Sequence, residues 1–199
     1  MDNLLISGGA VALIVVAIVL VLAIALVAWW ISTSNKLVRV KNKVEEAWAT
    51  IDVYLKKRYD LIPNLVETVK GYAKYEGDTL EKVVQARNIA GKAVTSEEKI
   101  SAENNLSNSL RTFLNVVSES YPDLKANTNF LDLQNQLKLI EGELESSRRY
   151  YNGMVKSFNT AIEVFPSSIV AQRKGEDYKK RPYFELDSVE ERQNVKVSF

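Results

Sequence analysis

One uninterrupted apolar stretch, residues 10–31, constrains the chain more than any other feature, because so much apolar surface has to be kept from water. The wider window of residues 3–35 contains no charged side chain. At about 1.5 Å of rise per residue, a helix over the apolar stretch is ~33 Å long, enough to cross the roughly 30 Å hydrocarbon core of a bilayer. The sequence therefore predicts a transmembrane segment.

The rival interpretation of this stretch is a cleaved signal peptide. Such a peptide starts with basic residues and has a shorter apolar region of about 7–15 residues. Here the only charge before the span is Asp2, and the apolar region is longer. We predict a retained anchor over residues 10–33, preceded by a short tail over residues 1–9.

Basic residues follow the span but do not precede it. Because positively charged flanks stay in the cytoplasm, we expect the amino terminus outside and the following domain inside, in a single-pass protein of the cell membrane. Tryptophan rings and cations both suit the headgroup region, so the bilayer itself is the first expected partner. The residues expected at this interface are Trp29, Trp30, Lys36, Arg39, Lys41 and Lys43.

Composition narrows the chemistry of the remaining chain. The formal net charge is +1 and no basic face stands out beyond the cations that follow the span, which argues against nucleic-acid binding. Cysteine and histidine are both absent, which removes disulfides, thiolate sites, the commonest metal ligand and the usual general base. We expect no catalytic residues, no metal, no cofactor and no small-molecule substrate.

An eleven-residue apolar repeat follows the span. The triplet Leu37, Val40 and Val44 recurs twice more, up to Val66. A period of eleven residues is about 3.67 residues per turn, which keeps the stripe on one face of a nearly straight helix. We expect the span and this segment to form one helix to about Tyr75, kinked at Pro63 and ended near Gly77.

Two start signals divide the middle of the chain. Asp78 and Thr95 are each followed three residues later by a glutamate, the pattern of a capping box. They predict a short helix to about residue 94 and a third helix that ends before Pro122.

A heptad repeat marks the last long helix, expected over residues 127–165. Gly142 and Gly153 interrupt it, and close packing against a neighbouring helix would compensate their helix-weakening effect. Ser167 and Ser168 are expected to cap a further short turn. The heptad positions are Phe130, Leu137, Leu144, Tyr151, Phe158 and Phe165, with Leu133, Ile140, Met154 and Ala161 between them.

The fold class expected from these segments is all-α. The transmembrane helix continues into an elongated antiparallel bundle over residues 34–172, built from three rods and about four helices with the middle rod broken near Thr95. A compact four-helix bundle, in which the third helix reverses, is the alternative. Residues 173–199 are expected to form a polar tail that is partly disordered.

A set of short motifs extends along the chain beyond the span. These motifs are Asn42-Lys43-Val44, Ala47-Trp48, Ile51-Asp52-Val53, residues 55–66, Val69-Lys70-Gly71-Tyr72, residues 121–126, Asn129-Phe130, Leu133-Gln134, Arg149, Tyr151-Asn152, Asn159 and Phe165-Pro166. Together they resemble the LemA family, over residues 36–166 and the anchor. The resemblance implies a bacterial membrane protein with one amino-terminal span and an all-helical domain, and it brings no established catalytic or binding residues. The segment from residue 173 to Tyr178 departs from the family pattern by lacking the first aromatic of an aromatic-Gly-aromatic turn, which leaves docking of the tail open.

The densest polar cluster lies beside the expected kink. It is either a partner-binding patch or a hydrogen-bonded layer that fixes helix register, and we favour the layer, with Asn129, Gln134, Asn152 and Asn159 as partners on the last helix. The cluster consists of Arg58, Tyr59, Asp60, Pro63 and Asn64.

Two further charged runs are expected to be solvated. Glu141, Glu143 and Glu145 alternate along a helix and do not converge on one site. Arg148 and its neighbours are expected to be exposed around one seam residue, Tyr151.

The function expected from the whole sequence is a membrane-anchored, non-catalytic scaffold or adaptor that assembles through its helical rods as a homo-oligomer, in a bacterial membrane-associated process. Small residues along the span suit close approach between copies. The alternative is an accessory subunit of a membrane enzyme or transport complex, bound to another membrane protein.

Overall fold

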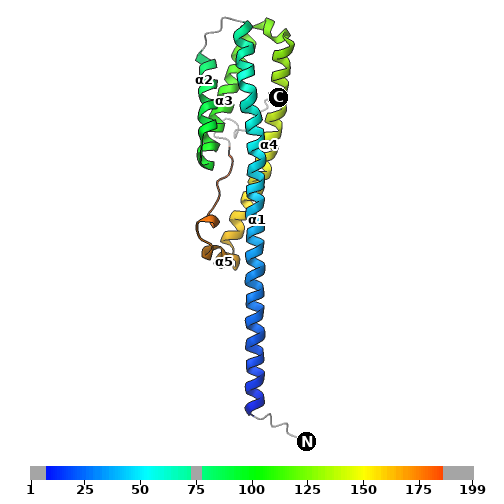
Figure 1. Cartoon of the computed structure of the whole chain (residues 1–199), viewed down its shortest axis with the longest axis vertical. Helices are drawn as coiled ribbons and strands as arrows, with labels where there is room; N and C mark the ends of the chain where they lie inside the picture. The colour runs from blue at the N-terminus through cyan, green and yellow to red at the C-terminus, as the bar shows by residue number, and fades with distance from the viewer. Residues whose placement is uncertain (1–7, 73–77, 186–199) are drawn as a thin grey trace, which may run out of the picture. The chain divides into compact units, whose positions relative to one another are not determined.

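The computed structural model describes residues 8–72 and 78–185, and Figure 1 shows how its helices follow one another. These residues form helices and connecting turns and contain no strand, so the predicted all-α class is confirmed. The expected cap at Gly77 and the end of the tail after Glu185 lie outside the described residues. The elements are α1 (Gly8–Tyr72), α2 (Asp78–Lys92), α3 (Ser96–Ser120), η1 (Pro122–Ala126), α4 (Thr128–Glu163), α5 (Ser167–Arg173) and η2 (Gly175–Tyr178).

Helix α1 is continuous over 65 residues, which confirms that the apolar span runs directly into the helix that follows it. It contains Pro63 without interruption, and the kink expected there stays a prediction. Among the described residues, α1 alone is long and apolar enough to cross a membrane, and none of its most apolar 18-residue window is buried. The core helix of a soluble protein would be mostly buried, so this exposure favours a lipid environment.

The predicted helix start at Thr95 is confirmed. The Glu98 backbone N–H donates to Thr95 Oγ1 at 3.2 Å, and the Thr95 backbone N–H donates to the Glu98 carboxylate at 3.2 Å. The two bonds satisfy donors that the first turn of α3 would otherwise leave free. Helix α2 begins at Asp78 as predicted and ends at Lys92, two residues earlier than expected.

Helices α2 and α3 lie side by side (Figure 1), so the in-line middle rod is wrong and the chain reverses near Thr95. The physical reason is the apolar face of α2. Leu80, Val83, Ala86 and Ala90 are buried in the same core as α3 residues, and an in-line arrangement would leave that face in water. The compact alternative with a reversed third helix is the one observed.

The chain divides into two compact units. Of the described residues, unit 1 comprises residues 8–43 and 156–181, and unit 2 comprises residues 44–72, 78–155 and 182–185. Helices α1 and α4 each contribute one segment to both units.

Unit 2 has a core formed by its segments of α1 and α4 together with α2, α3 and η1. The heptad positions Phe130, Leu137, Leu144 and Tyr151 are all buried, which confirms the seam over this part of α4. Phe165 is different, because it is 81% exposed. Its place in the seam is wrong, since α4 ends at Glu163 and the chain turns before the next heptad position.

The two glycines inside α4 do not mark close packing. A Cβ added at Gly142 or Gly153 would meet nothing within 4 Å, and both residues are exposed. The compensation that we expected is therefore wrong.

Unit 1 packs the end of α4 and helix α5 against α1. Leu37, Val170 and Ala171 are buried there, and Trp29 and Trp30 pack against them. Ser167 does not cap α5. Its hydroxyl instead donates to the carbonyls at the end of α4, at 2.7 Å to Ala161 and 3.1 Å to Val164.

The segment after α5 folds back within the same unit. Gly175 has a φ of 77°, a left-handed conformation that favours glycine, and it begins η2. The ring of Tyr178 then packs against Phe158, with centroids 6.0 Å apart. The start of the tail therefore docks although the first aromatic of the family turn is missing.

Candidate functional site

A buried cluster of charges lies in the middle of unit 2 and is built on Arg58 of α1. The Arg58 side chain is fully buried. Its guanidinium donates to Ser107 Oγ at 2.9 Å and to Glu141 Oε1 at 2.7 Å, and it forms an ion pair with Glu103. Glu103 is also fully buried, whereas Glu141 keeps 39% of its side chain exposed. One guanidinium thus connects three helices.

A second guanidinium, that of Arg148 on α4, lies at the edge of this cluster. It stacks over the ring of Phe184 at 4.3 Å from the centroid, and its Nε and Nη2 are buried without a hydrogen-bond partner among the described residues. One carboxylate oxygen of Glu103 is likewise buried and unpartnered there. A cation stacked on an aromatic face is stabilised by the ring quadrupole, which offsets part of the cost of burying Arg148.

Burial shifts the pKa of two members of this cluster, Glu103 and Arg148. It raises the pKa of the Glu103 carboxyl, because loss of hydration outweighs the attraction of Arg58 and Arg148. It lowers the pKa of the Arg148 guanidinium, and the like charge of Arg58 acts in the same direction. Burial and pairing with Arg58 therefore act in opposite directions on the pKa of Glu103.

The other members of the predicted polar cluster do not converge with Arg58. Tyr59 is half-buried, and its carbonyl accepts from Arg87 Nε at 2.9 Å. Asp60 is exposed and pairs with Lys56 at 2.8 Å along the helix surface. Pro63 is half-buried and Asn64 is exposed. Arg58 does lie in a buried hydrogen-bonded layer, and a partner-binding patch at the other four residues stays a hypothesis.

The expected partners of that layer are wrong. Asn129 is exposed, and Gln134 lines the cleft beside the cluster rather than binding Arg58. Asn152 and Asn159 bind the backbone of the carboxyl-terminal tail. Tertiary packing brings carboxylates of α3 and α4 to Arg58 instead, because an ion needs a counter-ion more than an amide when it is buried.

Two of the charged residues expected to be solvated are partly enclosed. Glu141 binds Arg58, and Arg148 packs on Phe184. Glu145 conforms to the expectation, since it pairs with Arg149 on the surface. Helical periodicity explains the difference, because residues 141 and 148 follow the buried seam at three- and four-residue spacing and residue 145 does not.

The tail crosses unit 2 as an extended segment. Asn152 binds both backbone groups of Phe184, and the Tyr151 hydroxyl donates to the Pro182 carbonyl at 3.0 Å. The Phe184 ring is buried, 6.3 Å from the ring of Trp48. These contacts hold residues 182–185 on the bundle.

A cleft of about 580 Å³ opens between α3 and α4, next to the buried cluster. Glu141 and Ser107 reach it from the cluster side, and its lining mixes polar and apolar side chains. The remaining lining residues are Leu110, Arg111, Leu114, Gln134, Asn135, Leu137 and Lys138.

The predicted interface residues lie in unit 1. Trp29 and Trp30 meet edge to face, with centroids 6.4 Å apart, and the Arg173 guanidinium lies 5.7 Å from the Trp30 centroid. Lys41 pairs with Asp177 at 3.0 Å. Lys36, Arg39 and Lys43 are exposed.

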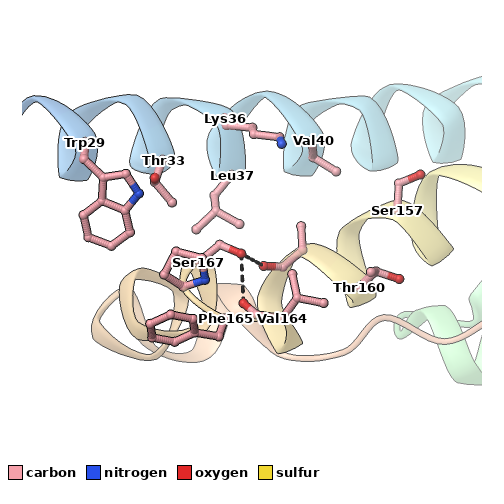
Figure 2. A pocket seen from close by; sticks show the side chains of 12 residues that line it. Trp29, Thr33, Lys36, Leu37, Val40, Ser157, Thr160, Val164, Phe165 and Ser167 are labelled. Atoms are coloured by element: carbon pink, nitrogen blue, oxygen red, sulfur yellow. Dashed lines mark hydrogen bonds between the residues drawn. The ribbon is translucent and has the colours of Figure 1, made fainter.

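An apolar groove of about 540 Å³ runs along unit 1 (Figure 2). Trp29, Thr33, Leu37 and Val40 reach into it from α1. The end of α4 and the turn that follows, residues 157–167, form the other wall.

Comparisons with known proteins identify the family of this chain. A sequence model of the LemA family matches residues 47–199. The chain belongs to the LemA family. Protein LemA of Metamycoplasma hominis is 29% identical over 145 residues, which cover 72% of this chain and 66% of that protein, slightly under two thirds of its length.

The sequence of this LemA-family chain did not lead us to the buried carboxylate that pairs with Arg58. Glu103 was not singled out, although a signal existed. It precedes Leu106, Leu110 and Phe113 at three- and four-residue spacing, so it occupies the apolar face of α3. Arg58 interrupts the apolar stripe of α1 in the same way. A charge within the buried stripe of each of two helices is the pattern that predicts a buried ion pair.

Proposed function

We propose that this LemA-family chain is a membrane-anchored, non-catalytic scaffold or adaptor of a bacterial membrane-associated process. The observation that carries the proposal is α1 itself. Its apolar part is exposed throughout its most apolar window, and the same helix continues without a break into two packed units. Because one helix is both the anchor and part of the folded units, it attaches the folded part of the chain to the bilayer.

A non-catalytic role is supported by the contacts of the buried charged side chains. The Arg58 guanidinium is fully buried and is bound on three sides by Ser107, Glu103 and Glu141. Groups that catalyse a reaction have to reach a substrate, whereas these groups reach one another. Their arrangement suits fixing the register of three helices.

The proposed orientation has the amino terminus outside and the bundle in the cytoplasm. Its support is the cations that follow the span, of which Lys36, Arg39 and Lys43 are exposed. Fusions of a reporter to the carboxyl terminus test it. A reporter active only in the cytoplasm supports the orientation, and one active only outside the cell overturns it.

Anchoring is tested by fractionation of the full-length chain. We expect it to stay in the membrane pellet after washing at high salt and at alkaline pH, because a span is held by apolar burial rather than by charge. A matched variant with Leu20→Arg and Leu22→Arg places two charges in the exposed apolar window and should be lost from the pellet. A wild-type chain released by the wash would exclude the anchor.

We further propose that copies assemble in the membrane. The support is the free surface of the span together with its small residues, Ala17, Ala23, Ala25 and Ala28, which permit close approach of helices. Mass photometry of nanodiscs prepared directly from membranes, without crosslinker, should give particles heavier than one 22.4 kDa protomer plus its lipid belt. If only single protomers appear across a wide range of protein-to-lipid ratios, self-assembly is excluded and a one-to-one adaptor remains as the proposal.

The cleft between α3 and α4 favours a second candidate function, an accessory subunit that binds one client protein. Its lining includes the exposed Lys138, whose charge would pair with an acidic group of a client. Lys138→Glu should abolish co-purification of such a client, whereas Lys156→Glu, a charge reversal at another exposed lysine of α4, should not.

A further inference from the structure

The turn between α4 and α5 exposes apolar side chains where a water-soluble protein would bury them. Phe165 is 81% exposed, Val164 is 47% exposed and Ile169 is 45% exposed. Isolated exposed apolar residues are ordinary, but these three lie within residues 164–169, Val164 and Phe165 on the turn itself and Ile169 in the first turn of α5. We call Val164, Phe165 and Ile169 the apolar turn.

The apolar turn adjoins the end of the span. The groove in Figure 2 has Val164 and Phe165 on one wall and Trp29 on the other, all within unit 1. Trp29 marks the end of the apolar stretch, where a tryptophan ring suits the headgroup region. The exposed apolar surface of the span therefore continues onto the turn.

Several polar groups at the turn already have hydrogen-bond partners within the chain, which favours a lipid environment. The N–H groups of Val164 and Ser168 donate to carbonyls of Thr160 and Val164, at 3.0 and 2.9 Å. The Ser167 hydroxyl donates to the carbonyls of Ala161 and Val164. Since these groups have partners within the chain, transfer toward lipid leaves none of them unsatisfied.

The distribution of charge in unit 1 also supports a membrane contact at the apolar turn. Beyond the span, residues 32–43 and 156–181 contain ten basic and three acidic residues, a formal net charge of +7, although the whole chain is only +1. Each of the three acids is paired with a lysine of the same unit: Glu163 with Lys180, Glu176 with Lys179 and Asp177 with Lys41. Unit 1 therefore combines exposed apolar residues with a surplus of cations, the combination that binds anionic lipid headgroups.

We propose that the apolar turn is a second membrane contact, seated in the interfacial layer of anionic lipids around the end of the span. Phe165 enters the acyl boundary beside Trp29, and the cations of unit 1 bind the phosphates above it. This inference rests on the proposed membrane anchor. It adds that unit 1 is held on the bilayer at two points rather than one, which restricts its tilt and rotation.

The test uses single cysteines in the full-length chain, which has no cysteine of its own. Phe165→Cys carries an environment-sensitive fluorophore in nanodiscs that contain phosphatidylglycerol. Val94→Cys is the matched control, because Val94 is an apolar residue of another helix-helix turn and is 90% exposed. Leu22→Cys lies near the middle of the span, so it reports on the anchor through lipids that carry the spin label deep in the acyl chain.

We expect the label at position 165 to show blue-shifted emission and strong quenching by lipids that carry a spin label just below the headgroup. The label at position 94 should show neither effect. Quenching at position 165 should weaken in nanodiscs of phosphatidylcholine alone, because the attraction of the +7 surface is then lost.

Three other results would overturn the inference. Equal, water-like emission at positions 165 and 94 with lipid quenching at position 22 removes the second contact and leaves the anchor. A label at position 165 that is shielded but not quenched by lipid shows that protein, such as a second copy, covers the turn. Absence of quenching at position 22 removes the anchor and the inference with it.

Discussion

The side-chain amide of Asn152 makes two hydrogen bonds with the backbone of Phe184. Asn152 Nδ2 donates to the Phe184 carbonyl at 3.0 Å, and the Phe184 N–H donates to Asn152 Oδ1 at 2.8 Å. A primary amide can act as donor and acceptor at once, so one side chain pairs with an extended backbone as a neighbouring strand would. This pairing places the Phe184 ring between Trp48 and Arg148.

We predict that Asn152→Ala releases the tail from unit 2. Each lost hydrogen bond removes about 1 kcal/mol, and nothing else in the substituted side chain can replace the pair. Chymotrypsin cleaves after aromatic residues, so cleavage after Phe184 should become faster while the helical content measured by circular dichroism stays unchanged.

Asn135→Ala is the control for this experiment, because Asn135 is an exposed asparagine of the same helix. It should leave cleavage after Phe184 at the wild-type rate. Equal cleavage rates in wild type and Asn152→Ala would mean that burial of the Phe184 ring alone holds the tail.

Much of the fold could be predicted because local signals agreed with tertiary packing. The capping pair Thr95 and Glu98 forms as expected, and the heptad positions from Phe130 to Tyr151 are buried. The in-line middle rod was wrong because a start signal fixes where a helix begins and not its direction. That direction depends on burial of the apolar face of α2, a long-range property.

The candidate site was less predictable for a related reason. Arg58 was identified from sequence, but its counter-ions Glu103 and Glu141 lie 45 and 83 residues further along the chain. Periodicity places each charge on a helix face, and only packing decides which faces meet. The docking of Phe184 depends likewise on a pairing between Asn152 and backbone that carries no sequence signal of its own.

Arg58→Ala is predicted to lower the free energy of unfolding by about 3–5 kcal/mol, because it leaves the buried Glu103 carboxylate without its partner. Urea unfolding in detergent micelles, followed by circular dichroism, measures the loss. Lys56→Ala breaks a surface pair with Asp60, whose side chains are 75% and 60% exposed, and should cost less than about 1 kcal/mol. Similar losses in the two variants would contradict the burial of the Arg58 cluster.

The raised pKa of Glu103 predicts a particular pH dependence. Its ordinary value is 4.5, and burial shifts it upward in the folded chain. At a pH between the unfolded pKa of 4.5 and the higher folded pKa, the folded state binds more protons than the unfolded state. The contribution of Glu103 to stability is therefore complete below pH 4.5 and is lost as the pH rises through the folded pKa. Wild type should therefore lose stability relative to Glu103→Gln over that interval, measured by urea unfolding from pH 4 upward. A stability difference that stays constant with pH would show that pairing with Arg58 cancels the effect of burial.

Gly142→Ala is predicted to stabilise the chain. Gly142 lies inside α4, is exposed, and has room for a Cβ, so alanine should raise the free energy of unfolding by about 0.5–1 kcal/mol through a smaller loss of backbone entropy. The same substitution at Gly175 serves as the control with the opposite sign, because a φ of 77° strains any residue that carries a Cβ. Thermal unfolding of both variants in the same micelles tests the pair. If Gly142→Ala destabilises the chain as Gly175→Ala does, an unseen neighbour such as a second copy packs on this face of α4, and the position of Gly142 becomes the place to look for that contact.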